Sequence, residues 1–193
     1  MRHLLAILIL FALCAGLASR PARAQSNAVT ATVDVRSAAT GSTNPKPGAP
    51  SDASGVVVWL KPLDATTPLP APNQTGHPRP QIAQHNKMFE PHLLVVQAGT
   101  VVDFPNRDPF FHNVFSLFDG KRFDLGLYEA GATNSVRFDR VGVSYLFCNI
   151  HPEMSAVVVA VDTTYFAVSD ASGAVTVTNV PAGRYELHVW YER

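Results

Sequence analysis

The chain has 193 residues, of which 47% are hydrophobic, and its 15 basic and 15 acidic side chains give a formal net charge of zero at pH 7. Such a balance offers no basic surplus for nucleic-acid binding, so nucleic acid is not an expected partner. Fifteen prolines, twelve glycines and no sustained helical periodicity after the N-terminal segment argue against a helical protein and predict an all-β chain.

The first 24 residues have the pattern of a secretory signal peptide. A cationic start is followed by an apolar run over residues 4–18 and by a small-x-small cleavage site at residues 22–24. The run is shorter than the about 20 residues that a membrane-spanning helix needs. We therefore expect an exported protein, periplasmic or extracellular, with no membrane span after cleavage. Cleavage would remove three arginines and no acid, which changes the net charge from 0 to −3.

Two strands are predicted before a proline-rich loop. Residues 28–36 alternate between apolar and polar or β-branched side chains, and residues 56–60 are continuously apolar. Prolines recur through residues 63–80, which is typical of an extended surface loop. The expected organisation of this part is N-terminal strands over residues 25–62 and the loop over residues 63–80.

From residue 81 the pattern changes to closely spaced short strands separated by glycine, proline and asparagine turns. The expected strands are 81–84, 92–97, 100–104, 113–117, 134–138, 144–148 and 156–162. This spacing predicts a Greek-key β-sandwich over residues 81–162. Residues 157–161 are nearly all apolar, which predicts a strand buried on both faces. Residues 163–193 add two further strands, 174–179 and 185–191, joined by a turn with proline and glycine.

One short loop carries a metal-ligand pattern. Cys148, His151 and Met154 follow one another at intervals of three residues, and His112 ends a loop earlier in the same β-rich stretch. Thiolate and thioether are soft donors, and imidazole suits both Cu(I) and Cu(II), so this set fits copper. Cleavage of the signal peptide would leave Cys148 as the only cysteine, unable to form an internal disulfide, and a ligand role explains it better than a free thiol does.

The run from His112 to Val114, the strand that ends at Cys148 and the His151-Pro152-Glu153-Met154 loop together resemble the cupredoxin family. The short ligand loop is similar to those of amicyanin and pseudoazurin, and the wider context resembles exported plastocyanin-like proteins of the methylamine-utilisation type. The resemblance implies one type 1 copper ion per chain, held by His112, Cys148, His151 and Met154. It also implies that Asn113 supports the site by hydrogen bonds.

Further implications of the resemblance concern function. An apolar surface around the metal would be formed by Phe110, Phe111, Phe115, Phe147 and Ile150. A one-electron carrier would exchange electrons through His151 with redox partner proteins that dock on this apolar end. Copper delivery or storage, and a sandwich without metal, remain as alternatives. An enzyme is not expected, because the chain has no His-x-His motif for further copper ions and no second cysteine for a binuclear centre.

The two ends of the chain show a second resemblance. Residues 169–187 are similar to the closing half of carboxypeptidase-regulatory-like sandwiches, and residues 28–60 to the opening half. The end strands either form such a second small sandwich or extend one larger sandwich. His85 and His92 could form an accessory copper contact. Asp103, Asp108 and Asp124 are expected to cap turns.

Overall fold

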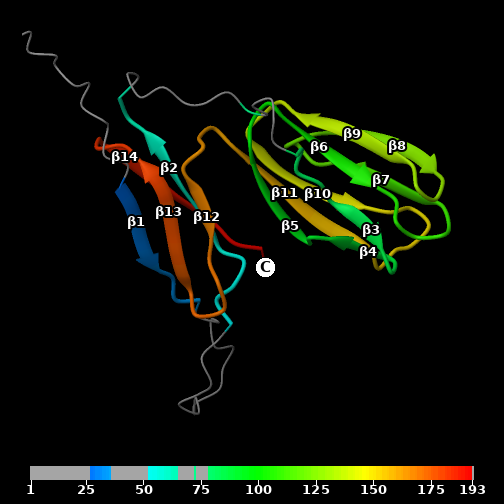
Figure 1. Ribbon diagram of the computed structural model, residues 1–193, viewed down its shortest axis with the longest axis horizontal. Coiled ribbons are helices and arrows are strands. Elements are labelled where there is room, and N and C mark those ends of the chain that lie inside the picture. Colours follow the sequence, from blue (N-terminus) through cyan, green and yellow to red (C-terminus); the bar gives the residue numbers. More distant parts are fainter. Residues whose placement is uncertain (1–26, 36–51, 65–71, 73–77, 193) are drawn as a thin grey trace, which may run out of the picture.

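The computed structural model describes residues 27–35, 52–64, 72 and 78–192, and the predicted signal peptide lies outside these ranges. In the described residues the chain forms strands, turns and loops but no helix, which confirms the all-β sandwich class. No described helix could therefore serve as a membrane span. The strands form two lobes that lie next to each other in Figure 1.

The first lobe is built from consecutive strands of the central part of the chain. These are β3 (Ala83–His85), β4 (Met88–Glu90), β5 (Leu93–Gln97), β6 (Thr100–Pro105), β7 (His112–Ser116), β8 (Phe123–Tyr128), β9 (Thr133–Phe138), β10 (Gly142–Phe147) and β11 (Ser155–Val161). Five of them form one sheet in the order β5-β11-β10-β7-β8, in which β5 and β11 are parallel. The pair β6-β9 and the hairpin β3-β4 make up the rest of the lobe.

Strand periodicity explains how this lobe forms its core. Along β6, Val102 and Phe104 are fully buried, while the residues between them are partly exposed. On β9, Val136 and Phe138 point the same way and join the same cluster, together with Val114, Leu146 and others from the five-stranded sheet. Full burial of one such side chain stabilises the folded state by about 1.5–3 kcal/mol relative to leaving it exposed. The same cluster contains Cys148 and Met154, so the ligand loop is anchored in this core at both ends.

The second lobe is built from strands at both ends of the described chain. They are β1 (Asn27–Thr32), β2 (Val57–Pro62), β12 (Phe166–Val168), β13 (Ala174–Val180) and β14 (Tyr185–Trp190). β1 pairs with β13, and the other three form a sheet in the order β12-β2-β14. Val58 and Leu60 of β2 and the valines of β13 belong to one small core. The end strands thus form two sheets with a core between them, and their separation as a domain stays a prediction.

Strand β11 joins the two lobes. Val157, Val159 and Val161 pack against Val57 and the tryptophans of the second lobe, Trp59 and Trp190. The alternate residues Ala156, Val158 and Ala160 face the core of the first lobe. Every residue from 156 to 161 is buried, which confirms the predicted burial on both faces. Lys61 and Asp162, 3.1 Å apart, form an ion pair beside this interface.

Three strands are absent from the sequence prediction, namely β4, β8 and β12. β8 contains Gly126, which has a φ of 65°, and its pairing with β7 shifts register in the middle. Glycine weakens a strand signal and often marks such an irregularity. β4 and β12 have three residues each, too few to show an alternation. Their strand conformation depends on pairing with neighbours that the local sequence does not reveal.

Candidate metal centre

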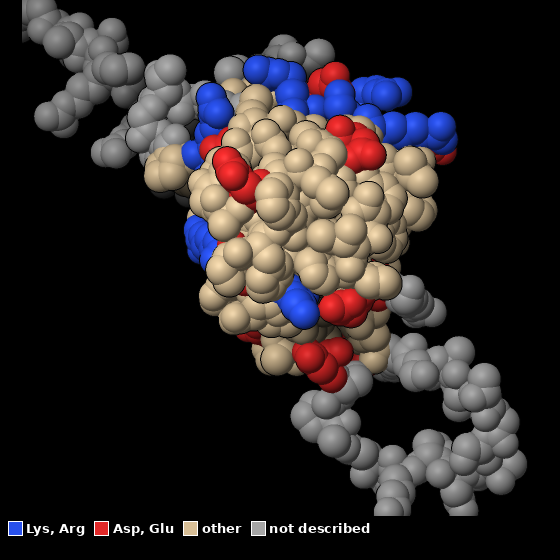
Figure 2. All heavy atoms as spheres, turned by 90° about the vertical axis from the view of Figure 1, so that its right-hand side faces the viewer, with Lys and Arg blue, Asp and Glu red and all other residues tan. Residues whose placement is uncertain are grey.

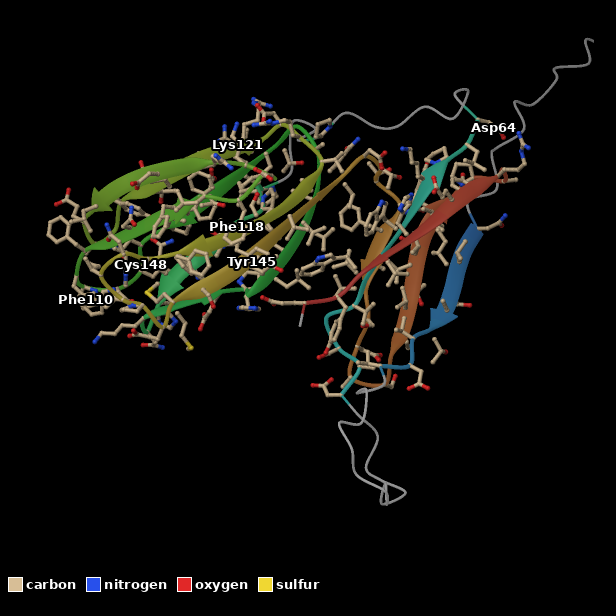
Figure 3. The ribbon with its side chains drawn as sticks, turned by 180° about the vertical axis from the view of Figure 1, so that it is seen from behind. Asp64, Phe110, Phe118, Lys121, Tyr145 and Cys148 are labelled. Atoms are coloured by element: carbon tan, nitrogen blue, oxygen red, sulfur yellow. The ribbon has the colours of Figure 1, made fainter. Side chains whose placement is uncertain are left out.

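Three predicted ligands meet at one end of the first lobe. The Nδ1 atoms of His112 and His151 are 3.1 Å apart, and the Sγ atom of Cys148 lies 4.0 Å from the first and 3.7 Å from the second. The ligand atoms of His112, Cys148 and His151 are therefore close enough to bind one metal ion. Among the described residues, this is the group of His, Cys, Asp and Glu side chains with such an arrangement. Figure 3 shows Cys148 near Phe110 at the end of the lobe away from the second lobe.

Strand register explains why these residues meet. β10 and β7 are antiparallel, with Phe147 opposite Phe115. If this register is continued beyond the strand end, His112 lies opposite residue 150, between Cys148 and His151 in the sequence. Cys148, which directly follows β10, is buried in the core of the lobe. The sheet register thus brings His112 next to the loop that carries Cys148 and His151.

Met154, the fourth predicted ligand, is brought to the same region. Its side chain is 1% exposed and belongs to the core cluster that contains Cys148. A turn places it there, because the Met154 N–H donates a 3.0 Å hydrogen bond to the His151 carbonyl oxygen. The donor set of one thiolate, two imidazoles and one thioether fits copper, which accepts soft sulfur and imidazole ligands in both oxidation states.

Asp108 sets the orientation of the His112 ring. The sequence did not predict this contact. The His112 Nε2–H group donates to Asp108 Oδ2 at 2.8 Å, and the two side chains are 0% and 5% exposed. A proton fixed on Nε2 leaves Nδ1 with its lone pair directed at Cys148 and His151. Carboxylates that hold the outer nitrogen of a histidine in this way are a common support of metal ligands.

Asp108 was expected to cap a turn, and it does so as well. Its carboxylate accepts backbone N–H bonds from Asn86 at 2.7 Å and Lys87 at 2.9 Å, in the turn between β3 and β4. Burial raises the pKa of Asp108, but the hydrogen bonds from Lys87, His112 and Asn86 outweigh it and hold the pKa below its ordinary value. A carboxylate four residues before a ligand histidine was the signal that the sequence offered for this contact.

Asn113 connects three segments around the ligands. Its amide nitrogen donates to Asp124 Oδ1 at 2.7 Å and to the Gly126 carbonyl oxygen at 3.1 Å, both in β8. Its amide oxygen accepts a 3.4 Å hydrogen bond from the N–H of Asn149, the residue after Cys148. Asp124 Oδ1 also accepts a 2.9 Å hydrogen bond from the Gly126 N–H, which is the expected turn-capping role. The same oxygen atom binds Asn113, so Asp124 fixes the position of that side chain as well.

A buried tyrosine lies below the ligands. Tyr128 pairs with His112 across β7 and β8, and its hydroxyl donates to Gln84 Oε1 at 2.5 Å and approaches the Phe104 carbonyl oxygen at 3.1 Å. Burial raises the pKa of Tyr128 well above its ordinary value. The charge of Cys148 adds to this shift, and the hydrogen bond with Gln84 opposes it. The phenol therefore stays neutral and closes the core beneath the site.

Aromatic and apolar side chains surround the outer side of the ligands. The Phe110 ring lies 5.2 Å from the His112 ring and 5.7 Å from the His151 ring, measured between centroids. Phe111 and Ile150 are 55% and 46% exposed. Figure 2 looks onto this end of the molecule and shows a face of mostly uncharged side chains with charged ones around it. His151, partly exposed, is the ligand nearest to solvent.

Two of the aromatic residues expected at this end lie elsewhere. Phe115 and Phe147 contact each other at 6.0 Å, and Phe147 also contacts Phe118 at 6.2 Å. Successive side chains of a strand point to opposite faces of the sheet, so Phe147 points away from the face that Cys148 occupies. The expectation that Phe115 and Phe147 surround the metal is therefore wrong.

The two histidines considered as an accessory copper pair have separate partners. His85 Nδ1 lies 3.5 Å from Glu90 Oε2. His92 contacts the Ser155 carbonyl oxygen through Nδ1 at 3.1 Å and Glu192 Oε2 through Nε2 at 2.7 Å. His92 thus links the start of β5 to the end of the second lobe, and the group of potential metal ligands found in the described residues includes neither histidine.

Comparisons with known proteins give no match to any protein-family model and none to a curated protein. Among solved structures the chain is similar to a purple cupredoxin from Nitrosopumilus maritimus, with 24% identity, 42% of this chain and 99% of the other covered, and a TM-score of 0.39. It is also similar to a reduced variant of amicyanin, with 22% identity, 43% and 82% coverage and a TM-score of 0.41.

A third similar structure is the copper-containing nitrite reductase of Thermus scotoductus SA-01, with 20% identity, coverage of 52% of this chain and 25% of that one, and a TM-score of 0.42. At these identities and TM-scores the likeness assigns no function. Cupredoxins are thus among the structures that the chain is similar to. The narrower resemblances, to methylamine-utilisation-type proteins and to carboxypeptidase-regulatory-like sandwiches, stay predictions.

Proposed function

We propose that this protein is an exported type 1 copper protein that carries one electron at a time between redox partners. The observation that carries the proposal is the convergence of His112 Nδ1, His151 Nδ1 and Cys148 Sγ in a buried site. In this proposal Met154 is the weak fourth ligand. Copper bound to such a set supplies reversible one-electron chemistry between Cu(I) and Cu(II).

The protein would contribute to this function by holding the metal ligands in a fixed geometry. Asp108 holds His112, Asn113 holds the segment after Cys148, and the Met154–His151 hydrogen bond closes the ligand loop. Ligands that are already positioned move little when the charge of the metal changes, so electron transfer needs little reorganisation. The single titratable sulfur at the site is buried, which protects it from oxidation by solvent species.

The exposure of the ligands supports one place for electron exchange. Cys148, His112 and Met154 are 3%, 0% and 1% exposed, whereas His151 reaches the surface among apolar side chains. We therefore infer that redox partners approach the end of the lobe around His151. An uncharged face lets two proteins come close without the cost of removing water from charges.

A visible and electron-paramagnetic-resonance spectrum of the protein with Cu(II) tests the proposal. We expect an intense thiolate-to-copper absorption band and a narrow copper hyperfine splitting. In the matched variant Cys148→Ser, which changes one atom of the side chain, both signatures should be lost while the fold is kept, as checked by circular dichroism. A wild-type protein that binds Cu(II) without the band, or binds no copper, would contradict a type 1 site.

The apolar end can be tested without knowing a partner, by electron self-exchange between reduced and oxidised copies. Ile150→Lys places a positive charge beside His151 on both copies, so we expect self-exchange to slow several-fold and to recover partly at high salt. NMR line broadening in mixtures of the two oxidation states measures the rate. Leu187→Lys, an equal charge change at a 60% exposed position of β14 in the second lobe, is the control and should have no effect. Equal slowing by both variants would contradict the proposal that electrons are exchanged at the end of the lobe around His151.

A further inference from the structure

The buried ligands raise the question of how a metal ion reaches them. Of the four predicted ligands, three are at most 3% exposed, and the partly exposed His151 lies under the Phe110 ring. An incoming ion therefore first meets the outer surface of this end of the lobe. A weak binding site there would raise the local concentration of the ion and shorten its search.

The β3-β4 hairpin presents metal-binding side chains at this place. Its turn has only two residues, Asn86 and Lys87, with φ angles of 53° and 56°, and His85 is directly opposite Met88 in the register. Directly opposite residues of an antiparallel pair project to the same face with Cβ atoms about 5 Å apart. Gln84 and Phe89 occupy the other face and are buried. His85 and Met88 must therefore share the outer face.

Both side chains are accessible and chemically suited to cuprous copper. Met88 is 52% exposed, and the His85 side chain is 46% exposed. The contacts of His85 with Asn86 and Glu90 involve Nδ1, so Nε2 is the nitrogen available for a ligand. A thioether and an imidazole are donors that favour Cu(I), and Glu90, on the same face, adds a negative charge beside them.

The hairpin is linked directly to the buried site. The Asp108 carboxylate that binds the N–H groups of Asn86 and Lys87 also binds His112. The Lys87 ammonium group lies 5.7 Å from the centre of the Phe110 ring, which in turn contacts His112 and His151. Asp108 and Phe110 thus connect the turn of the hairpin to the two ligand histidines.

We propose that His85 and Met88 form a surface site that takes up Cu(I) and passes it to His112, Cys148, His151 and Met154. The inference rests on the proposed function for its second half. Transfer is a ligand exchange in which the Cu(I) bonds to Met88 and His85 break, bonds to the buried ligands form, and the Cys148 thiol releases its proton to solvent. The oxidation state of copper does not change, so no electron donor or acceptor is needed.

The surface site is tested first by itself. In the Cys148→Ser protein labelled with 13C at the methionine methyl groups, the signals of Met88 and Met154 report separately on titration with Ag(I), a redox-inert ion with the ligand preferences of Cu(I). We expect the Met88 signal to move at a near-equimolar amount of Ag(I). Adding His85→Asn should raise the amount required several-fold. A Met88 signal that stays in place while Met154 moves would overturn the proposal.

The role in uptake is tested by kinetics. The coloured Cu(I) complex of bicinchoninate loses absorbance as the apoprotein removes the metal, which gives a loading rate. Met88→Leu keeps size and loses the sulfur ligand, so loading should slow several-fold while the final amount of bound copper is unchanged. Met88→His restores a ligand and should restore the rate. Equal rates in the wild type and Met88→Leu would contradict the proposed uptake.

The two proposals fail in different ways. A Met88 response to Ag(I) in a protein whose Cu(II) form has no thiolate-to-copper band would leave the surface site and remove the type 1 assignment. A normal thiolate-to-copper band together with a Met88 signal that does not respond to Ag(I) would support the type 1 site and contradict the surface site.

Discussion

Replacing Val159 by Asp is expected to separate the two lobes, whereas replacing its neighbour Val158 by Asp is expected to open the first lobe itself. Both residues lie on β11, but Val159 faces the tryptophans of the second lobe and Val158 faces the core around Cys148. A carboxyl group buried without a partner costs on the order of 4 kcal/mol. Asp at 159 can regain water when the lobes move apart, while Asp at 158 regains it only when the sandwich opens.

Two residue-specific probes distinguish these outcomes. Both tryptophans of the chain, Trp59 and Trp190, contact the interface between the lobes, so their fluorescence should shift to longer wavelength in Val159→Asp. Cys148 is 3% exposed and should stay protected from thiol reagents in Val159→Asp but react in Val158→Asp. Val159→Ala, which adds no charge, serves as the control. An unshifted tryptophan spectrum in Val159→Asp would show that the interface is not the feature that holds the lobes together.

Asp108→Ala is expected to have the second large effect, on both stability and metal binding. The substitution removes the acceptor of three N–H groups, those of Asn86, Lys87 and His112. Three hydrogen bonds to a charged carboxylate are lost and the buried His112 donor is left unpaired, so we expect the free energy of unfolding of the apoprotein to fall by about 3–5 kcal/mol. Affinity for Cu(I) should fall about 10- to 100-fold, since His112 would lose its fixed tautomer and orientation.

Urea unfolding and competition with bicinchoninate measure these two quantities, and 15N shifts of the His112 ring report its tautomer directly. Asp108→Asn keeps one oxygen acceptor and should lie between Ala and the wild type. Asp103→Ala removes a carboxylate of the first lobe that bonds Ser135 and Arg79, far from His112 in the hydrogen-bond network, and should leave Cu(I) affinity unchanged. Equal Cu(I) affinities of Asp108→Ala and the wild type would show that His112 is oriented by other contacts.

The sequence predicts well those features that depend on residues close together in the chain. Cys148, His151 and Met154 stand out because one loop carries them, and β11 stands out because an uninterrupted apolar run can only be buried on both faces. Features that depend on distant pairing were missed. β8 is concealed by Gly126, and the contact of Asp108 with His112 depends on how the loop before β7 folds over the β3-β4 turn.

The same reasoning explains the misplaced aromatic residues. Phe147 is adjacent to Cys148 in sequence, which suggested a shared environment, yet adjacency in a strand places two side chains on opposite faces. Likewise, His85 and His92 are close in sequence but belong to different strand connections with different partners. Proximity in the chain was informative in the ligand loop, where the backbone turns back on itself, and misleading along extended strands.

The pairing of β1 with β13 and of β2 with β14 has a consequence for the order in which the molecule is made. The first lobe is continuous in sequence, from β3 to β11, and can form its sheets as soon as residue 161 is available. The second lobe must wait until β14 has been synthesised, because within the described part of the chain β2 pairs with β12 and β14. During that interval Val157, Val159 and Val161 of β11 face water. Nascent chains would be prone to associate through these three valines unless the last strand follows quickly.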